Sequence, residues 1–260
     1  MNTIVLLALL LFILMVAIGG EKGVSSFVAI FLNFIVLMVS ILFMLTPQAN
    51  PIIVTLIACI VISCINLFFI NEINTKTKTA FLSSILTIFV LLVFIWWMTD
   101  ISKIQGFGEE EVEELTVFSL YTGTDFVKIA ASVIIMSTIG AITDAAMAIS
   151  SPMYEMRYHN PHASRKELYN FGIQIGKDIL GTSANTLFFA FFGGYIALLI
   201  WFKDLDYSFG EIINSKIFSS EMITIFCAGT GVALVIPVTA LITAYFFTRV
   251  KKRKVLDLTE

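Results

Sequence analysis

The sequence has little charge and few residues of the kinds that bind metals or form disulfides. Only 13% of its 260 residues are charged, whereas a soluble domain carries roughly a quarter, so an ordinary globular surface is excluded. The net charge of −3, without any basic stripe, gives no indication of nucleic-acid binding. The three cysteines lack metal-ligand spacing, and His159 and His162, which are three residues apart beside a proline turn, have no third ligand. We therefore expect no nucleic-acid partner, metal or cofactor, and interpret Cys59, Cys64 and Cys227 as small buried apolar side chains.

The N-terminus lacks the features of a secretory signal. No Lys or Arg precedes the apolar segment from Thr3 to Ile18, and no convincing small-x-small cleavage site follows it. A signal peptide needs both. We therefore expect this segment to be retained as a first membrane span.

Long apolar runs are what the chain has in abundance. It is 58% hydrophobic, with a mean hydropathy of +0.94. A helix needs roughly 17–25 apolar residues to cross about 30 Å of hydrocarbon, and runs this long satisfy their backbone groups as helices. The sequence therefore predicts an all-α polytopic membrane protein with about seven transmembrane helices, at approximately 3–19, 24–45, 51–70, 80–98, 127–149, 179–202 and 222–247.

The distribution of Lys and Arg predicts the orientation of these helices. Cytoplasmic loops carry an excess of both residues. With the N-terminus outside and the C-terminus in the cytoplasm, twelve of the 16 basic residues lie inside and four outside. The inside set is Lys22, Lys76, Lys78, Arg157, Arg165, Lys166, Lys177, Arg249, Lys251, Lys252, Arg253 and Lys254, and the outside set is Lys103, Lys128, Lys203 and Lys216. The basic tail is expected to contact the anionic headgroups of the lipid bilayer.

The two parts of the chain differ in composition. Residues 1–126 hold four runs that are almost purely Leu, Ile, Val and Phe, with Asn33 and Asn66 as the main polar exceptions, and an acidic outside loop at 109–114. Residues 127–260 hold three runs richer in small and polar residues. Polar groups are costly in lipid and need a reason to be there. We interpret the first part as an apolar scaffold and expect the function in the second.

Asp144 is the first candidate for a functional residue. It lies about five residues past the middle of its run, or roughly 8 Å towards the cytoplasm. An ionised Asp at this depth costs up to about 2.5–3.5 kcal/mol, so it should be paired, hydrated or protonated. A role in ion coupling and a structural hydrogen bond between helices both fit. The same helical face carries small residues that let another backbone approach, namely Ser137, Gly140, Ala141 and Ala148.

A polar stripe that leads into the run at 179–202 is the second candidate. Steps of three or four residues place its members on one helical face. A stripe that faces a water-filled vestibule and one that packs against the 127–149 helix look alike in sequence. We favour a packed interior face that holds the functional site. The stripe consists of Gln174, Asp178, Gly181, Thr182 and Asn185.

The segment between these two runs carries signals for a turn and a helix start. Asn160-Pro161 predicts a turn. Ser164 and Glu167 have the spacing of a capping box, which predicts a helix that runs on into 179–202. Glycines allow close contact between helices. We expect helix packing at Gly140, Gly172, Gly176 and Gly181.

Two blocks and the turn between them carry a family resemblance. The first is G-A-x-x-D-x-A-M-x-I from Gly140 to Ile149, and the second is G-x-x-I-G-x-D-I-x-G-T-x-x-N-T-L from Gly172 to Leu187. Together with Asn160-Pro161 they resemble the YibE/F family of bacterial multi-spanning membrane proteins. The resemblance implies a place in the bacterial cytoplasmic membrane and a short form without the large extracellular domain of many members. It also implies a longer YibE/F paralogue as a partner, with a homo-oligomer as the alternative, and it names no biochemical activity.

Two functions are expected from these observations. The first is a transporter or transport-complex subunit, coupled to ions or protons through Asp144 and Asp178, and a weaker resemblance to the SecD/SecF and RND membrane units implies the same use of membrane acids. The second is a non-catalytic membrane subunit that assembles with the longer paralogue. We expect no enzymatic activity, because Gly176-Lys177-Asp178 lacks the G-x-G-D signature of intramembrane aspartyl proteases and no other catalytic motif is present.

Overall fold

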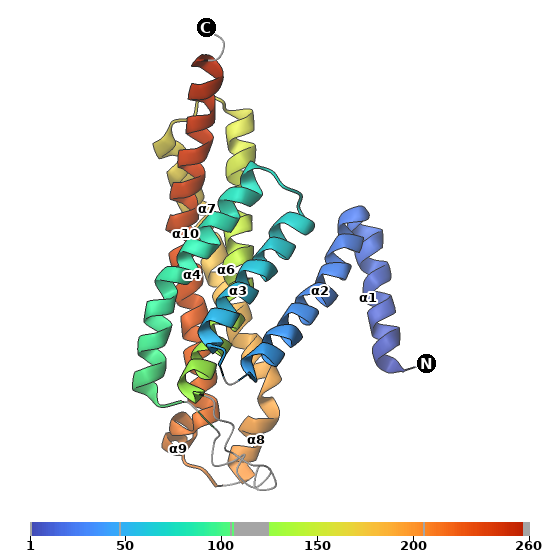
Figure 1. The fold of residues 1–260 in the computed structure, drawn as a ribbon, viewed down its shortest axis with the longest axis vertical. Coiled ribbons are helices and arrows are strands. Elements are labelled where there is room, and N and C mark those ends of the chain that lie inside the picture. Colours follow the sequence, from blue (N-terminus) through green and yellow to red (C-terminus); the bar gives the residue numbers. More distant parts are fainter. Residues whose placement is uncertain (1, 47, 105, 107–124, 205, 257–260) are drawn as a thin grey trace.

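The structure, a computed structural model, describes residues 2–46, 48–104, 106, 125–204 and 206–256, and within these ranges it contains helices and no strand (Figure 1). The acidic run at 109–114 lies outside the described residues. The predicted all-α class is confirmed. In chain order the helices are α1 (Thr3–Gly19), α2 (Glu21–Met44), α3 (Pro51–Cys64), the π-helix η1 (Ile65–Phe69), α4 (Thr75–Ser102), α6 (Phe126–His159), α7 (Arg165–Gly194), α8 (Ile196–Asp204), α9 (Phe209–Asn214) and α10 (Lys216–Leu256).

Most of these helices are long and apolar enough to cross a membrane. Five meet both conditions, counting α3 with η1 as one, and α7 with α8 makes a sixth if this pair, bent by 51°, is one broken span. The apolar α1 has 17 residues, at the short limit for a span. The chain is thus a multi-pass membrane protein. The number seven and the orientation stay predictions, although the termini lie towards opposite ends of the molecule (Figure 1).

Local signals begin and end these helices where the sequence predicts. Ser164 Oγ accepts from the Glu167 amide at 3.2 Å, and a Glu167 carboxylate oxygen accepts from the Ser164 amide at 2.7 Å, so the capping box is confirmed. The helix that it begins, α7, runs without a break to Gly194. The Asn160-Pro161 turn follows directly on the end of α6, and a 2.8 Å hydrogen bond from Arg157 Nη1 to the Ala163 carbonyl closes it.

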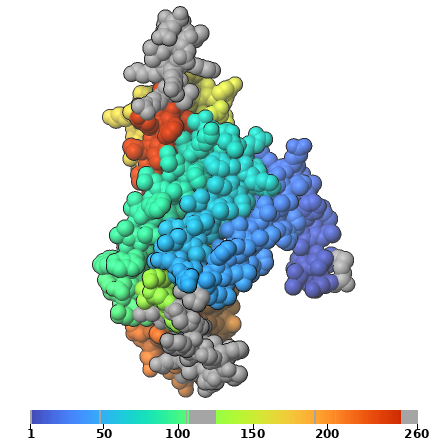
Figure 2. Space-filling model, viewed as in Figure 1, coloured from blue at the N-terminus to red at the C-terminus, as the bar shows by residue number. Residues whose placement is uncertain are grey.

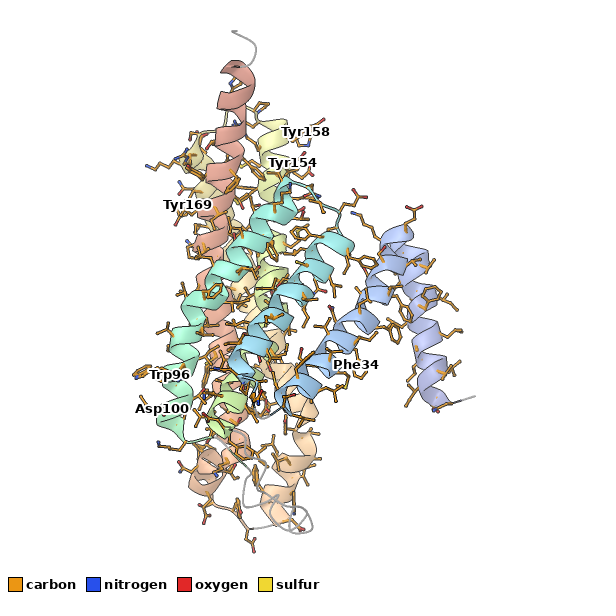
Figure 3. All side chains as sticks on the ribbon, viewed as in Figure 1. Phe34, Trp96, Asp100, Tyr154, Tyr158 and Tyr169 are labelled. Carbon is orange, nitrogen blue, oxygen red and sulfur yellow. The ribbon has the colours of Figure 1, made fainter. Side chains whose placement is uncertain are left out.

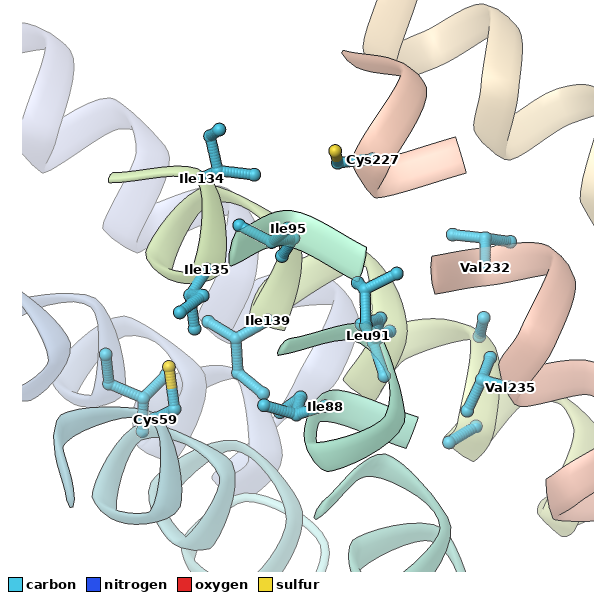
Figure 4. Packing of buried hydrophobic residues seen from close by; sticks show 14 of the residues in the cluster. Cys59, Ile88, Leu91, Ile95, Ile134, Ile135, Ile139, Cys227, Val232 and Val235 are labelled. Carbon is cyan, nitrogen blue, oxygen red and sulfur yellow. The ribbon is translucent and has the colours of Figure 1, made fainter. Parts of the chain in front are cut away.

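The main core lies where α4, α6 and α10 meet. Figure 4 shows Leu91 of α4, Ile139 of α6 and Val235 of α10 in one cluster of buried side chains. Gly231 allows the close approach, because a Cβ there would lie 2.9 Å from Ile142 Cδ1. Farther along, α10 also packs against α7. Cys59 and Cys227 are buried in this core as free thiols, as predicted, while Cys64 is half-buried.

The first two helices form an arm that stands out from the rest of the molecule (Figure 2). No residue of α1 is buried, and this helix packs against α2. Gly23 permits that contact, because a Cβ there would overlap the Met15 carbonyl. The arm exposes large apolar side chains along its length, such as Leu7 and Phe34. Such a surface suits the lipid bilayer.

Aromatic side chains mark the two ends of the helical bundle. Trp96 lies near the end of α4 beside Asp100, whereas Tyr154 and Tyr158 lie at the opposite end on α6 (Figure 3). All three aromatic side chains are exposed. Trp and Tyr concentrate at the two membrane–water interfaces. The apolar zone between these positions is therefore the part of the bundle that suits the hydrocarbon.

Candidate functional site

Asp144 lies on the side of α6 that points away from the core. The buried positions of this helix recur every three or four residues, as at Ile139, Ile142 and Ile149. Asp144 falls between them and is exposed, as are Ser137 and Ala148 on the same face. The small residues that were predicted to surround the acid do share its face. In the part of the chain that the structure describes, the Asp144 side chain therefore stays accessible.

The polar stripe of α7 is also on the outside. Its five members, Gln174, Asp178, Gly181, Thr182 and Asn185, are all exposed. The prediction of a packed interior face is therefore wrong. The physical reason is that α7 has a second face, made of small residues, and this face packs against α10. Two residues along a helix correspond to a rotation of about 200°. Gln174 and Asp178 follow Gly172 and Gly176 by two positions, so the stripe points away from α10.

The four glycines divide into two pairs. A Cβ at Gly172 would lie 2.6 Å from Met153 Sδ and 2.9 Å from Ala240 Cβ, and a Cβ at Gly176 would overlap Ile236. These two glycines lie at close helix contacts. At Gly140 and Gly181 a Cβ would meet no atom within 4 Å, so the described residues make no close helix contact there, and the packing role of this pair stays a prediction. Both lie on the outward faces of their helices and leave the backbone accessible.

The polar side chains on these outward faces differ in their hydrogen bonding. Thr182 Oγ1 donates to the Ile179 carbonyl at 2.9 Å, and Thr186 Oγ1 donates to the Thr182 carbonyl at 2.9 Å. These hydroxyls are therefore satisfied by their own helix. In the part of the chain that the structure describes, the side chains of Asp144 and Asp178 make no hydrogen bond or ion pair, either with each other or with another residue. Both carboxylates are open to water, protons, cations or another chain.

A groove between α7 and α10 continues the stripe towards the other end of the bundle. It has a volume of about 470 Å³, and its lining includes Asn185, Phe188, Gly229 and Thr230. A Cβ at Gly229 would meet no atom within 4 Å, so this glycine leaves the groove open. The Asn185 amide is a polar group in an otherwise mainly apolar wall. The stripe thus ends beside a concave surface rather than inside the bundle.

A second set of polar groups, which sequence reasoning missed, lies inside the bundle. The inner face of α4 buries Ser83 and Thr87, whose hydroxyls donate to the carbonyls of Thr79 and Ser83 at 2.7 and 2.8 Å. On α10 the Oγ1 atoms of Thr239 and Thr243 are buried and have no partner among the described residues. The expectation that the run at 80–98 is almost purely Leu, Ile, Val and Phe is therefore wrong. The spacing of four residues between Thr79, Ser83 and Thr87 is the sequence pattern that could have predicted this buried polar face.

Comparisons with known proteins identify one family. The family model described as YibE/F-like protein matches residues 7–249. The match extends the resemblance from the two motif blocks to nearly the whole chain. No curated protein and no solved structure matches the chain. Among the described residues, no group of three or more His, Cys, Asp or Glu side chains is placed to hold a metal ion.

Proposed function

Given that the chain belongs to the YibE/F-like family, we propose that it is a subunit of a transport system in the bacterial cytoplasmic membrane, coupled to the movement of protons or other cations through Asp144 and Asp178. The observation that carries this proposal is that polar side chains of both α6 and α7 are exposed at membrane depth. We call these positions together the acidic face, namely Asp144 on α6 and Gln174, Asp178, Thr182 and Asn185 on α7.

Contact between the acidic face and lipid is energetically unfavourable. An unpaired carboxylate costs several kcal/mol in hydrocarbon, and acids within membrane helices therefore face water, a partner or a transported ion. Exposed apolar side chains lie on the same two helices, as at Val133 and Phe189. A hydrated path along the acidic face would supply the water that the carboxylates need. Carboxylates in such paths can take up and release protons.

The position of the acidic face favours a subunit over a self-contained transporter. The main core between α4, α6 and α10 is packed with apolar side chains (Figure 4), and among the described residues the polar side chains buried in the bundle are Ser and Thr hydroxyls, with no carboxylate. A path along the outside of α6 and α7 needs a second wall, which another chain would supply. We therefore place the coupled step at a junction between this chain and a partner in the membrane.

Neutral variants of the two acids test this proposal. In cells that lack their own copy, Asp144→Asn and Asp178→Asn should fail to restore the deletion phenotype although the variants reach the membrane in normal amounts. Asp204→Asn is the matched control, because Asp204 is an exposed acid at the end of α8 and lies outside the acidic face. Full restoration by both Asn variants would contradict ion coupling through these groups.

A second candidate function is a structural membrane subunit without a transport step, which assembles with a longer YibE/F paralogue. The open space beside Gly140 and Gly181 favours it, because small residues allow another helix to approach closely. Purification of the tagged protein in mild detergent should then recover the paralogue. Gly140→Leu should abolish that recovery, whereas Gly193→Leu, at an exposed glycine near the end of α7, should not. Recovery of a lone monomer from the wild-type chain would argue against this candidate.

A further inference from the structure

We propose that a groove between the first turns of α7 and residues 241–246 of α10 binds an anionic phospholipid. Its phosphate would lie on Arg165 and Lys166, and one acyl chain would lie along the apolar wall. This site is separate from the acidic face and does not depend on the function proposed for it.

The groove has the size and the composition of a lipid site. Its volume is about 570 Å³, within the range of about 300–1,000 Å³ that is common for small-molecule sites. Its wall is almost wholly apolar, with Tyr169 from α7 and Leu241, Ala244 and Phe246 from α10. Leu241 is 62% exposed, so the apolar wall is accessible to an acyl chain.

The charged end of the groove is already arranged for an anion. Arg165 Nε donates to Thr248 Oγ1 at 3.2 Å, and its guanidinium carbon lies 4.9 Å from the centre of the Tyr245 ring. These contacts hold the arginine in place and leave its terminal nitrogens for a phosphate, which guanidinium groups bind by two parallel hydrogen bonds. Because these contacts already restrict the Arg165 side chain, binding costs less of its side-chain entropy.

No carboxylate competes for these cations in the part of the chain that is described. Neither Arg165 nor Lys166 has an Asp or Glu oxygen within 4 Å there. The nearest acid in sequence, Glu167, is engaged in the capping box with Ser164. Two adjacent positive charges therefore remain without compensation at the end of an apolar groove. An anionic headgroup with an acyl chain complements both parts, whereas a soluble phosphate complements only one.

The position along the bundle also fits a headgroup. Figure 3 places Tyr169 towards the same end of the bundle as Tyr154 and Tyr158, the end where one aromatic zone lies. The two cations precede Tyr169 by about one turn of α7, on the side away from the apolar zone. Basic pockets between membrane helices at this level bind anionic headgroups. The sequence assigns this end to the cytoplasm.

Lipid binding by the purified full-length chain tests the proposal. The chain is held in a zwitterionic detergent, and phosphatidylglycerol or phosphatidylcholine is added while retained lipid is counted by native mass spectrometry. We expect phosphatidylglycerol to bind and the double variant Arg165→Gln/Lys166→Gln to weaken its binding at least tenfold. The matched control is Lys22→Gln/Lys78→Gln, which removes two exposed cations assigned to the same side of the membrane and should change binding less than twofold.

Two further variants and a competition with soluble glycerol phosphate complete the experiment. Lys166→Gln alone should weaken binding about threefold or more, and since Lys166 is exposed without a described partner, this variant will fold even if the double variant does not. Leu241→Gln should weaken phosphatidylglycerol binding through the acyl chain. Equal binding of both lipids, an equal loss in the control, or displacement of the lipid by soluble glycerol phosphate would overturn the proposal.

Discussion

Asn33 Nδ2 donates a 2.7 Å hydrogen bond to Asn66 Oδ1, and this bond joins α2 to the π-helix η1. The two residues are the main polar exceptions in the apolar first part of the chain, and they lie 33 positions apart. A π-helical turn widens the helix locally and often occurs where a side chain needs a special position. Here it occurs at the residue that meets the arm formed by α1 and α2. The bond therefore fixes the arm against the bundle.

Removing either asparagine should loosen the arm. We expect Asn33→Ala and Asn66→Ala each to lower the free energy of unfolding by about 0.6–2 kcal/mol, since hydrogen bonds between membrane helices contribute in this range. Detergent-induced unfolding measures the effect. The double variant supplies the control, because a shared bond makes the two losses less than additive. Fully additive losses would mean that the amides do not act as a pair.

The glycine face of α7 predicts a contrast between two glycines of one helix. Gly176→Ala forces Ile236 to move and should destabilise the protein by about 1–3 kcal/mol through overpacking. Gly181→Ala meets no neighbour and should be neutral or stabilising by up to about 1 kcal/mol, because Ala favours helix. Unfolding in detergent measures both. The losses of Gly176→Ala and Ile236→Ala should be less than additive in the double variant, and full additivity would contradict the contact.

A pH-dependent cap is expected on α9. Hydrogen bonds from the Ser208 side chain, and then from its backbone, lower the pKa of Glu211 below its ordinary value. A lowered folded pKa stabilises the folded form above the unfolded pKa, and this stabilisation is lost as the pH falls through the folded pKa. Amide exchange in α9 should therefore speed up under acid conditions at which an ordinary Glu is already protonated. Ser208→Ala should move the transition towards the ordinary value, and an unchanged transition would contradict the cap.

Most of the fold could be predicted from local signals in the sequence. Apolar length predicts the helices, and Ser164 with Glu167 predicts the start of α7, because both depend on residues close together in the chain. Periodicity states which residues share a face, but it does not state which face turns inwards. On α7 the glycine face and the acidic face lie about 200° apart, and either could have met α10. The glycine face packs against α10 because glycines allow the backbones of the two helices to approach closely. The pairing of Asn33 with Asn66 needs the same three-dimensional information.

The most direct test of the central claim measures whether water reaches the acidic face in the membrane. In a chain without its native thiols, Thr182→Cys and Asn185→Cys are compared with Phe34→Cys, which lies on an exposed but apolar part of α2 (Figure 3). A charged thiol reagent reacts only where water is present, and all three variants should react after denaturation. In native membranes we predict that the two cysteines of the acidic face react at least about tenfold faster than the one on α2. Equally slow reaction at all three positions would contradict a hydrated path along α6 and α7.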